Sequence, residues 1–145
     1  MAPLQKRAWW GFGVGLAFAI AFALVFVLLG GIQTFDADPT FRIIIDALLI
    51  GALIVNLVIV NIPLRNPKIV DERDIRIVER APRIQWLAAI FTLVAWVIAL
   101  NEVYQDTGLI PAVYLFVMFM SVLIVSTLAQ CLGIVLGYWR ANRYG

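Results

Sequence analysis

The chain has 145 residues, of which 63% are hydrophobic and 14% are charged, and its formal net charge is +2. Soluble domains carry roughly 45–50% apolar and about 25% charged residues, so this composition excludes an ordinary water-soluble protein. The chain has no histidine and one cysteine, Cys131, which leaves no His-ligated haem, His/Cys zinc site or Cys–His catalytic pair. We therefore expect no enzyme activity, no cofactor, no metal site and no direct binding of nucleic acid.

Four apolar runs predict four transmembrane helices. They lie near residues 9–31, 41–62, 84–103 and 110–137. Each supplies the ~20 residues that cross a hydrocarbon core of ~30 Å. The first run exceeds the apolar region of about 7–15 residues in a cleaved signal peptide, so we expect a signal anchor. The predicted fold class is all-α, a four-helix transmembrane bundle that occupies residues 1–145 as one membrane domain.

Small residues line one face of the first span, where Gly11, Gly15, Ala19 and Ala23 recur every four residues. Such a surface lets helix backbones approach closely. Two further seams have helical spacing: Ala88, Thr92, Ala95, Ala99 and Glu102 in the third span, and Ser126, Gln130, Gly133 and Gly137 in the fourth. These seams indicate either packing within one chain or a homodimer.

The second span begins with Asp38, a predicted N-cap followed by proline, and it carries polar residues within the apolar run. Arg42 and Asp46 are spaced i,i+4 and form either the start of a proton or cation path or a neutralised pair at the interface. Asn56 and Gln130 of the fourth span are candidates for a hydrogen bond between helices or for lining a path.

The connection over residues 63–83 carries most of the charge of the chain. Asp71 is a predicted N-cap, and Glu72 with Arg76 forms a favourably ordered i,i+4 pair. A short charged helix over 71–83 is therefore expected to lead into the third span. Its candidate partner-binding residues are Arg73, Asp74, Arg76, Glu79 and Arg80.

The basic residues also predict the orientation of the chain. Every Lys and Arg except Arg42 lies before the first span, between the second and third, or after the fourth. The positive-inside rule places this side in the cytoplasm. We expect a multi-pass protein of the cell (inner) membrane, surrounded by the lipid bilayer, with both termini cytoplasmic.

Residues 71–74 read Asp-Glu-Arg-Asp and lead into the third span. With the four-span layout, this motif resembles families of small uncharacterised prokaryotic membrane proteins in which an Asp-Glu-Arg loop opens the third helix. Pro82, just after the motif, departs from that pattern. Some members are encoded beside small helix-turn-helix regulators, so the resemblance implies a role in tethering or signalling.

Two functional hypotheses follow from these residues. The first is a non-enzymatic accessory or regulatory-tethering protein that binds a cytoplasmic or membrane protein through the 71–83 helix. The second is a small transporter or channel in which Asp46 couples protons or cations and Asn56 and Gln130 line the path. The first span contains no acidic residue, unlike small drug/proton antiporters, and this difference favours the first hypothesis.

Overall fold

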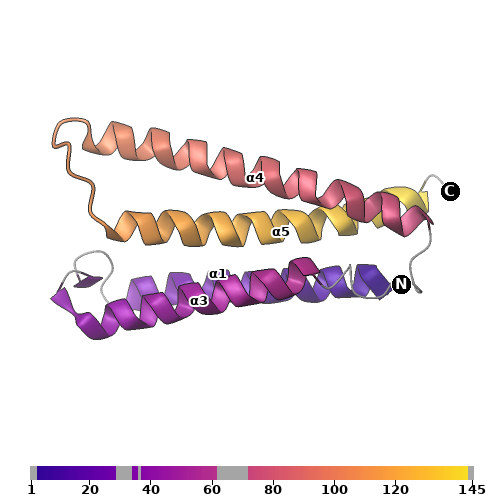
Figure 1. Ribbon diagram of the computed structural model, residues 1–145, viewed down its shortest axis with the longest axis horizontal. Helices are drawn as coiled ribbons and strands as arrows, with labels where there is room; N and C mark the ends of the chain where they lie inside the picture. Colours follow the sequence, from indigo (N-terminus) through magenta and orange to yellow (C-terminus); the bar gives the residue numbers. More distant parts are fainter. Residues whose placement is uncertain (1–2, 29–33, 36, 62–71, 144–145) are drawn as a thin grey trace.

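The computed structural model describes residues 3–28, 34–35, 37–61 and 72–143. Nearly all of these residues lie in four long helices (Figure 1). The helices are α1 (Pro3–Leu28), α3 (Pro39–Asn61), α4 (Glu72–Tyr104) and α5 (Val113–Arg143). Each contains a stretch that is long and apolar enough to cross a membrane. The prediction of an all-α, multi-pass membrane architecture is confirmed.

The helix ends follow local chemistry. α3 begins where predicted, because the Thr40 N–H donates to Asp38 Oδ1 at 2.8 Å and proline occupies the first helical position. α4 is followed by a turn in which the Gly108 N–H donates to the Tyr104 carbonyl at 2.9 Å. Gly108 has φ +64°, a conformation that glycine adopts without a steric penalty.

The largest departures from the predicted spans are at the charged ends. α1 and α4 begin well before the apolar runs, at Pro3 and Glu72, and α5 continues past its run to Arg143. These extra turns carry charged residues and keep their backbone groups bonded within the helix. The predicted end of the first span, residues 29–31, lies outside the described residues.

α5 is the central helix of the bundle. It lies between α4 on one side and the pair α1 and α3 on the other (Figure 1). It contacts all three, whereas α1 and α3 contact each other little. The start of α1 and the end of α5 lie at the same end of the bundle (Figure 1).

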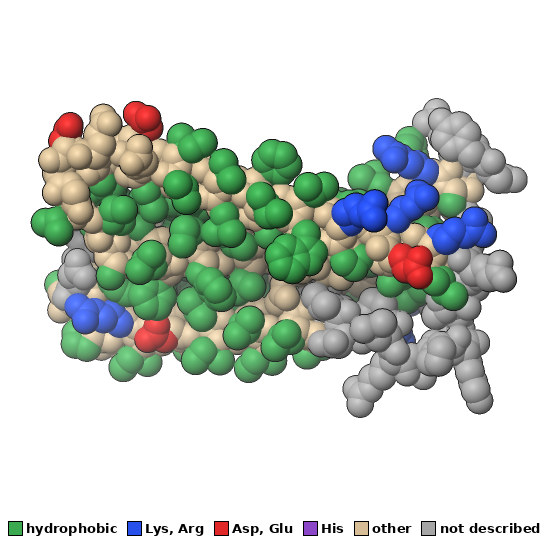
Figure 2. Space-filling view, turned by 45° about the horizontal axis from the view of Figure 1, so that its top comes forward, with side chains coloured by type: hydrophobic (Ala, Val, Ile, Leu, Met, Phe, Trp, Pro, Cys, Tyr) green, Lys and Arg blue, Asp and Glu red, His purple; other side chains and the backbone are tan. Residues whose placement is uncertain are grey.

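This shared end is basic, and the opposite end is mainly acidic. We call the first the basic end; its described cations are Lys6, Arg7, Arg76, Arg80, Arg83 and Arg140. The acidic end, with the start of α3 and the end of α4, carries Asp38, Glu102 and Asp106, together with Arg42. Apolar side chains cover the surface between the two ends (Figure 2). This distribution matches a bundle whose middle lies in hydrocarbon.

Two apolar clusters close the ends of the bundle. At the basic end, α1, α4 and α5 contribute Leu4, Ala8, Ile77, Ala81, Ile134 and Tyr138. At the acidic end, Phe35, Phe41, Ile45 and Val113 are buried together. Buried polar side chains, Ser126, Thr127 and Gln130, occupy α5 between the two clusters. The interior is therefore apolar at its ends and partly polar in its middle.

Small residues let α5 approach its neighbours closely, as the fourth-span seam predicts. A Cβ on Gly137 would lie 2.7 Å from Ile77 Cγ2 of α4, and one on Gly133 would lie 2.8 Å from Ile84 Cδ1. The α1 face is confirmed at Gly15, where a Cβ would lie 3.1 Å from Leu128 Cδ2.

The small-residue face predicted for the third span is wrong in its outer half. Ala95, Ala99 and Glu102 are exposed, and α4 instead meets α5 through Trp96, whose Nε1–H donates to Ser121 Oγ at 2.7 Å. The outer half of the first-span stripe is also on the surface, because Ala23 is exposed. A bulky indole can be buried with its N–H bonded, so small size alone did not identify the contact face.

The substitution Gly137→Ala is expected to lower the stability of the bundle by about 1–3 kcal/mol, because the new methyl group would overlap the Ile77 side chain. The β-branched Ile77 has one strongly preferred rotamer in a helix and cannot turn away at low cost. Reversible unfolding in mixed detergent measures the effect. The matched control is Gly13→Ala, where a Cβ meets no atom within 4 Å. Equal stability of the two variants would contradict the contact.

Candidate functional site

The charged segment predicted between the second and third spans is the beginning of α4. The helix runs without a break from Glu72 to Tyr104, with Pro82 inside it. Because proline lacks an N–H, the backbone bond to the Val78 carbonyl is missing, yet the helix continues. The charged segment and the span therefore form one helix, in place of the separate short helix expected over 71–83.

One face of the charged segment is fixed to the bundle. Ile77 and Ala81 are buried against Leu4 and Ala8 of α1 and against Tyr138 of α5. Moving the segment away would return this apolar surface to water, at a cost of about 25 cal/mol for each Å². The opposite face of the segment therefore keeps a fixed orientation.

That opposite face is exposed and charged. Its exposed residues are Ile75, Arg76, Glu79, Arg80 and Arg83. Arg73 and Asp74 belong to α4, but their side chains lie outside the described residues. The structure thus places three of the five predicted partner-binding side chains on one accessible segment. Basic side chains gather at this end of the molecule (Figure 2).

A groove between α4 and α5 adjoins this segment. It has a volume of about 650 Å³, and it is lined by Arg76 and Arg80 of α4 and by Arg140 of α5. Gly133 and Gly137 also line it and leave it open because they have no side chains. Sequence reasoning missed the groove, since spacing along one helix does not show which helix faces it. The groove combines positive charge with an apolar lining.

The transport candidates near the acidic end do not point into the bundle. Arg42 donates from Nε to the Phe35 carbonyl at 2.7 Å, and its guanidinium carbon lies 5.7 Å from the centre of the Phe35 ring. Asp46, four residues later, is exposed on the outside of α3. These positions agree with an interfacial arrangement in which a charged head reaches out of the hydrocarbon.

Asn56 and Gln130 do not bond to each other. Asn56 Nδ2 donates to Thr127 Oγ1 of α5, and Thr127 Oγ1 donates to the Leu123 carbonyl at 2.7 Å. The space beside Asn56 and Thr127 is about 20 Å³, enough for about one water molecule. Asn56 is therefore a link between α3 and α5. Thr127 was missed because a threonine that bonds its own helix gives no signal in the sequence.

Gln130 lies deeper in the bundle than any other amide described. It is 5% exposed, and its Oε1 accepts no hydrogen bond. A buried acceptor without a donor carries its full desolvation cost, which makes this residue exceptional in the described part of the chain.

Comparison with family models, curated proteins and solved structures finds no match to this chain. Within the described ranges, no group of three or more His, Cys, Asp and Glu side chains is placed to hold a metal ion. The candidate site therefore rests on the chain's own geometry, and the resemblance of residues 71–74 to a known motif stays a prediction.

Replacing either partner of the Asn56–Thr127 bond is expected to weaken the contact between α3 and α5 by roughly 0.6–1.7 kcal/mol. Asn56→Leu and Thr127→Val should each lower the unfolding free energy in detergent. The double variant should cost little more than one single variant, because the two changes remove the same bond. Asn101→Leu, at an exposed position of α4, is the control. Fully additive losses would contradict the bond.

Proposed function

We propose that this chain is a non-enzymatic membrane protein that acts as an interaction and regulatory-tethering module, with the charged segment of α4 binding a protein partner. The observation that carries the proposal is the fixed, exposed charged face of this segment. Ile77 and Ala81 hold one side in the bundle, while Arg76, Glu79 and Arg80 are exposed on the other. A surface of fixed geometry loses less conformational entropy on binding than a free loop does.

The charge pattern supports a location in the inner membrane of a prokaryote, with the basic end in the cytoplasm. Of the described cations, only Arg42 lies at the acidic end. The positive-inside rule retains Lys and Arg in the cytoplasm, and both termini belong to the basic end in this proposal. The partner is then a cytoplasmic protein or the cytoplasmic part of a membrane protein.

The exposed charges favour a partner with an acidic surface. Arg76, Arg80 and Arg83 outnumber the single described acid on this face, Glu79. Complementary charge speeds association and selects the partner, and Arg140 at the neighbouring groove extends the positive region. Glu79 supplies a position at which a basic group of the partner is favoured.

Transport finds less support in the geometry. A coupling acid normally faces the bundle interior or a water-filled cavity, but Asp46 is exposed on the outside of α3. Asn56 is bonded to Thr127, and the adjoining space is about 20 Å³. These features describe a packing contact between helices.

A photoreactive amino acid in place of Glu79 tests the proposal in the native membrane. Irradiation is expected to yield one adduct of defined mass with a second protein. Introducing Arg80→Glu and Arg83→Glu should reduce that adduct about tenfold or more, because each change places like charges against an acidic surface. Mass spectrometry of the adduct identifies the partner.

Glu102→Lys is the matched control, since it changes an exposed charge at the opposite end of the same helix and should leave the adduct intact. The bundle's melting temperature in detergent should be the same for all these variants. Adducts with lipid only, or an adduct that survives the charge reversal, would contradict the proposal. An adduct with a second copy of this chain would show a homodimer in its place.

A further inference from the structure

A cavity of about 460 Å³ lies between α1, α3 and α5, toward the basic end. Its volume falls within the range of roughly 300–1,000 Å³ that is typical of small-molecule sites. Its apolar walls include Val14 of α1, Val55 of α3 and Ile134 of α5. Along α1 the lining extends from Leu4 to Val14, which corresponds to ~15 Å of helix. The space is therefore long, apolar and enclosed by three helices.

The cavity opens toward the surrounding hydrocarbon. Its lining includes Trp10, which is 70% exposed, and Ile54, which is 56% exposed. Both belong to the apolar surface of the bundle, and the gap between them exists because α1 and α3 contact each other little. A hydrocarbon chain in the bilayer reaches this space sideways without crossing water.

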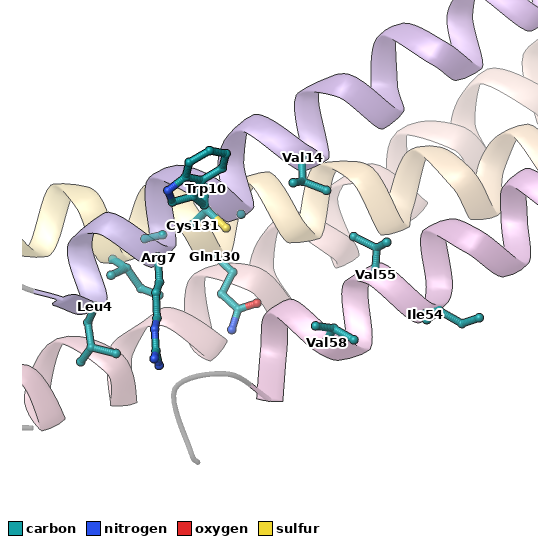
Figure 3. Close-up of a pocket in the computed structure, with 12 residues that line it drawn as sticks. Leu4, Arg7, Trp10, Val14, Ile54, Val55, Val58, Gln130 and Cys131 are labelled. Atoms are coloured by element: carbon teal, nitrogen blue, oxygen red, sulfur yellow. The ribbon is translucent and has the colours of Figure 1, made fainter. Parts of the chain in front are cut away.

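Gln130 gives the apolar cavity a specific polar demand. Its side chain projects from α5 into the space between Val58 and Arg7 (Figure 3). It is 5% exposed, and its Oε1 accepts no hydrogen bond. A saturated hydrocarbon alone would leave this oxygen unsatisfied, so the fitting ligand carries a hydrogen-bond donor.

Arg7 supplies the charge at the mouth of the same cavity. It lines the cavity from α1 and is exposed at the basic end. A guanidinium binds a phosphate by paired, charge-assisted hydrogen bonds. The cavity thus offers an anion site at its mouth, an acceptor deeper inside and an apolar space beyond it.

We infer that this cavity binds a monoacyl glycerophospholipid, a single-chain anionic lipid with a free hydroxyl beside its phosphate. Arg7 binds the phosphate, Gln130 Oε1 accepts the hydrogen bond of the glycerol hydroxyl, and the acyl chain fills the apolar space. In a diacyl lipid that hydroxyl is esterified and donates no hydrogen bond. A fatty acid with its carboxylate at Arg7 also brings no donor to Gln130. The inference is independent of the α4 surface and of the function proposed for it.

Native mass spectrometry of the full chain in a maltoside detergent, titrated with 1-oleoyl lysophosphatidic acid, tests this inference. A saturable 1:1 adduct is expected. Gln130→Leu should raise its Kd about tenfold, the usual effect of one lost hydrogen bond near a charged group. The 2-O-methyl ether of the same lipid should show the same loss with the unaltered protein and no further loss with Gln130→Leu.

Arg7→Gln should also raise the Kd about tenfold or more, whereas Lys6→Gln should not. Lys6 is the neighbouring cation, which is exposed and does not line the cavity. The ether analogue leaves the protein unchanged, so its result does not depend on how a variant folds. Equal affinity for lysophosphatidic acid and its ether would overturn the inference. Non-saturable binding of many lipids, or equal losses with Arg7→Gln and Lys6→Gln, would overturn it as well.

Discussion

The structure depends on hydrocarbon being the solvent of its outer surface. Large apolar side chains such as Trp86, Phe91 and Val97 are exposed along α4, an arrangement that water would penalise by about 25 cal/mol for each Å². In lipid this exposure carries no such cost, and no hydrophobic force between the helices arises from it. Cohesion must then come from close backbone approach and from a few hydrogen bonds between helices.

Those contacts converge on α5, and their distribution explains both candidate sites. Gly133 and Gly137 bring α4 close on one side, while Thr127 bonds Asn56 of α3 on the other. α4 has its main contacts with α5 alone, so one side of its charged segment stays open to a partner. α1 and α3 are each held by α5 more than by each other, and the cavity lies in the gap between them. A single central helix thus leaves one exposed surface and one lateral opening.

The sequence sufficed for features that depend on one helix at a time. The four spans, the Asp38 N-cap and the basic end follow from hydropathy, capping chemistry and charge counting, which need no knowledge of neighbouring helices. Features shared by two helices were not predictable in the same way. Glu102 has the spacing of a buried seam but is exposed, and Asn56 bonds Thr127 where Gln130 was expected as a candidate. Which face of an apolar helix turns inward is decided by the shape of its partner, and nearly uniform hydrophobicity gives no moment to reveal it.

Spin labels at two positions test the central claim, that lipid contacts the outside of the bundle and α5 forms its interior. One label replaces Val97, which is 63% exposed on α4, and the other replaces Ser126, which is 6% exposed on α5, with Cys131→Ala as the background. In bilayers, collisions with oxygen and with a water-soluble nickel chelate are measured for each label. The structure predicts high oxygen and low nickel accessibility at position 97, with low values of both at position 126. Nickel accessibility above oxygen accessibility at position 97, or identical behaviour of the two labels, would contradict it.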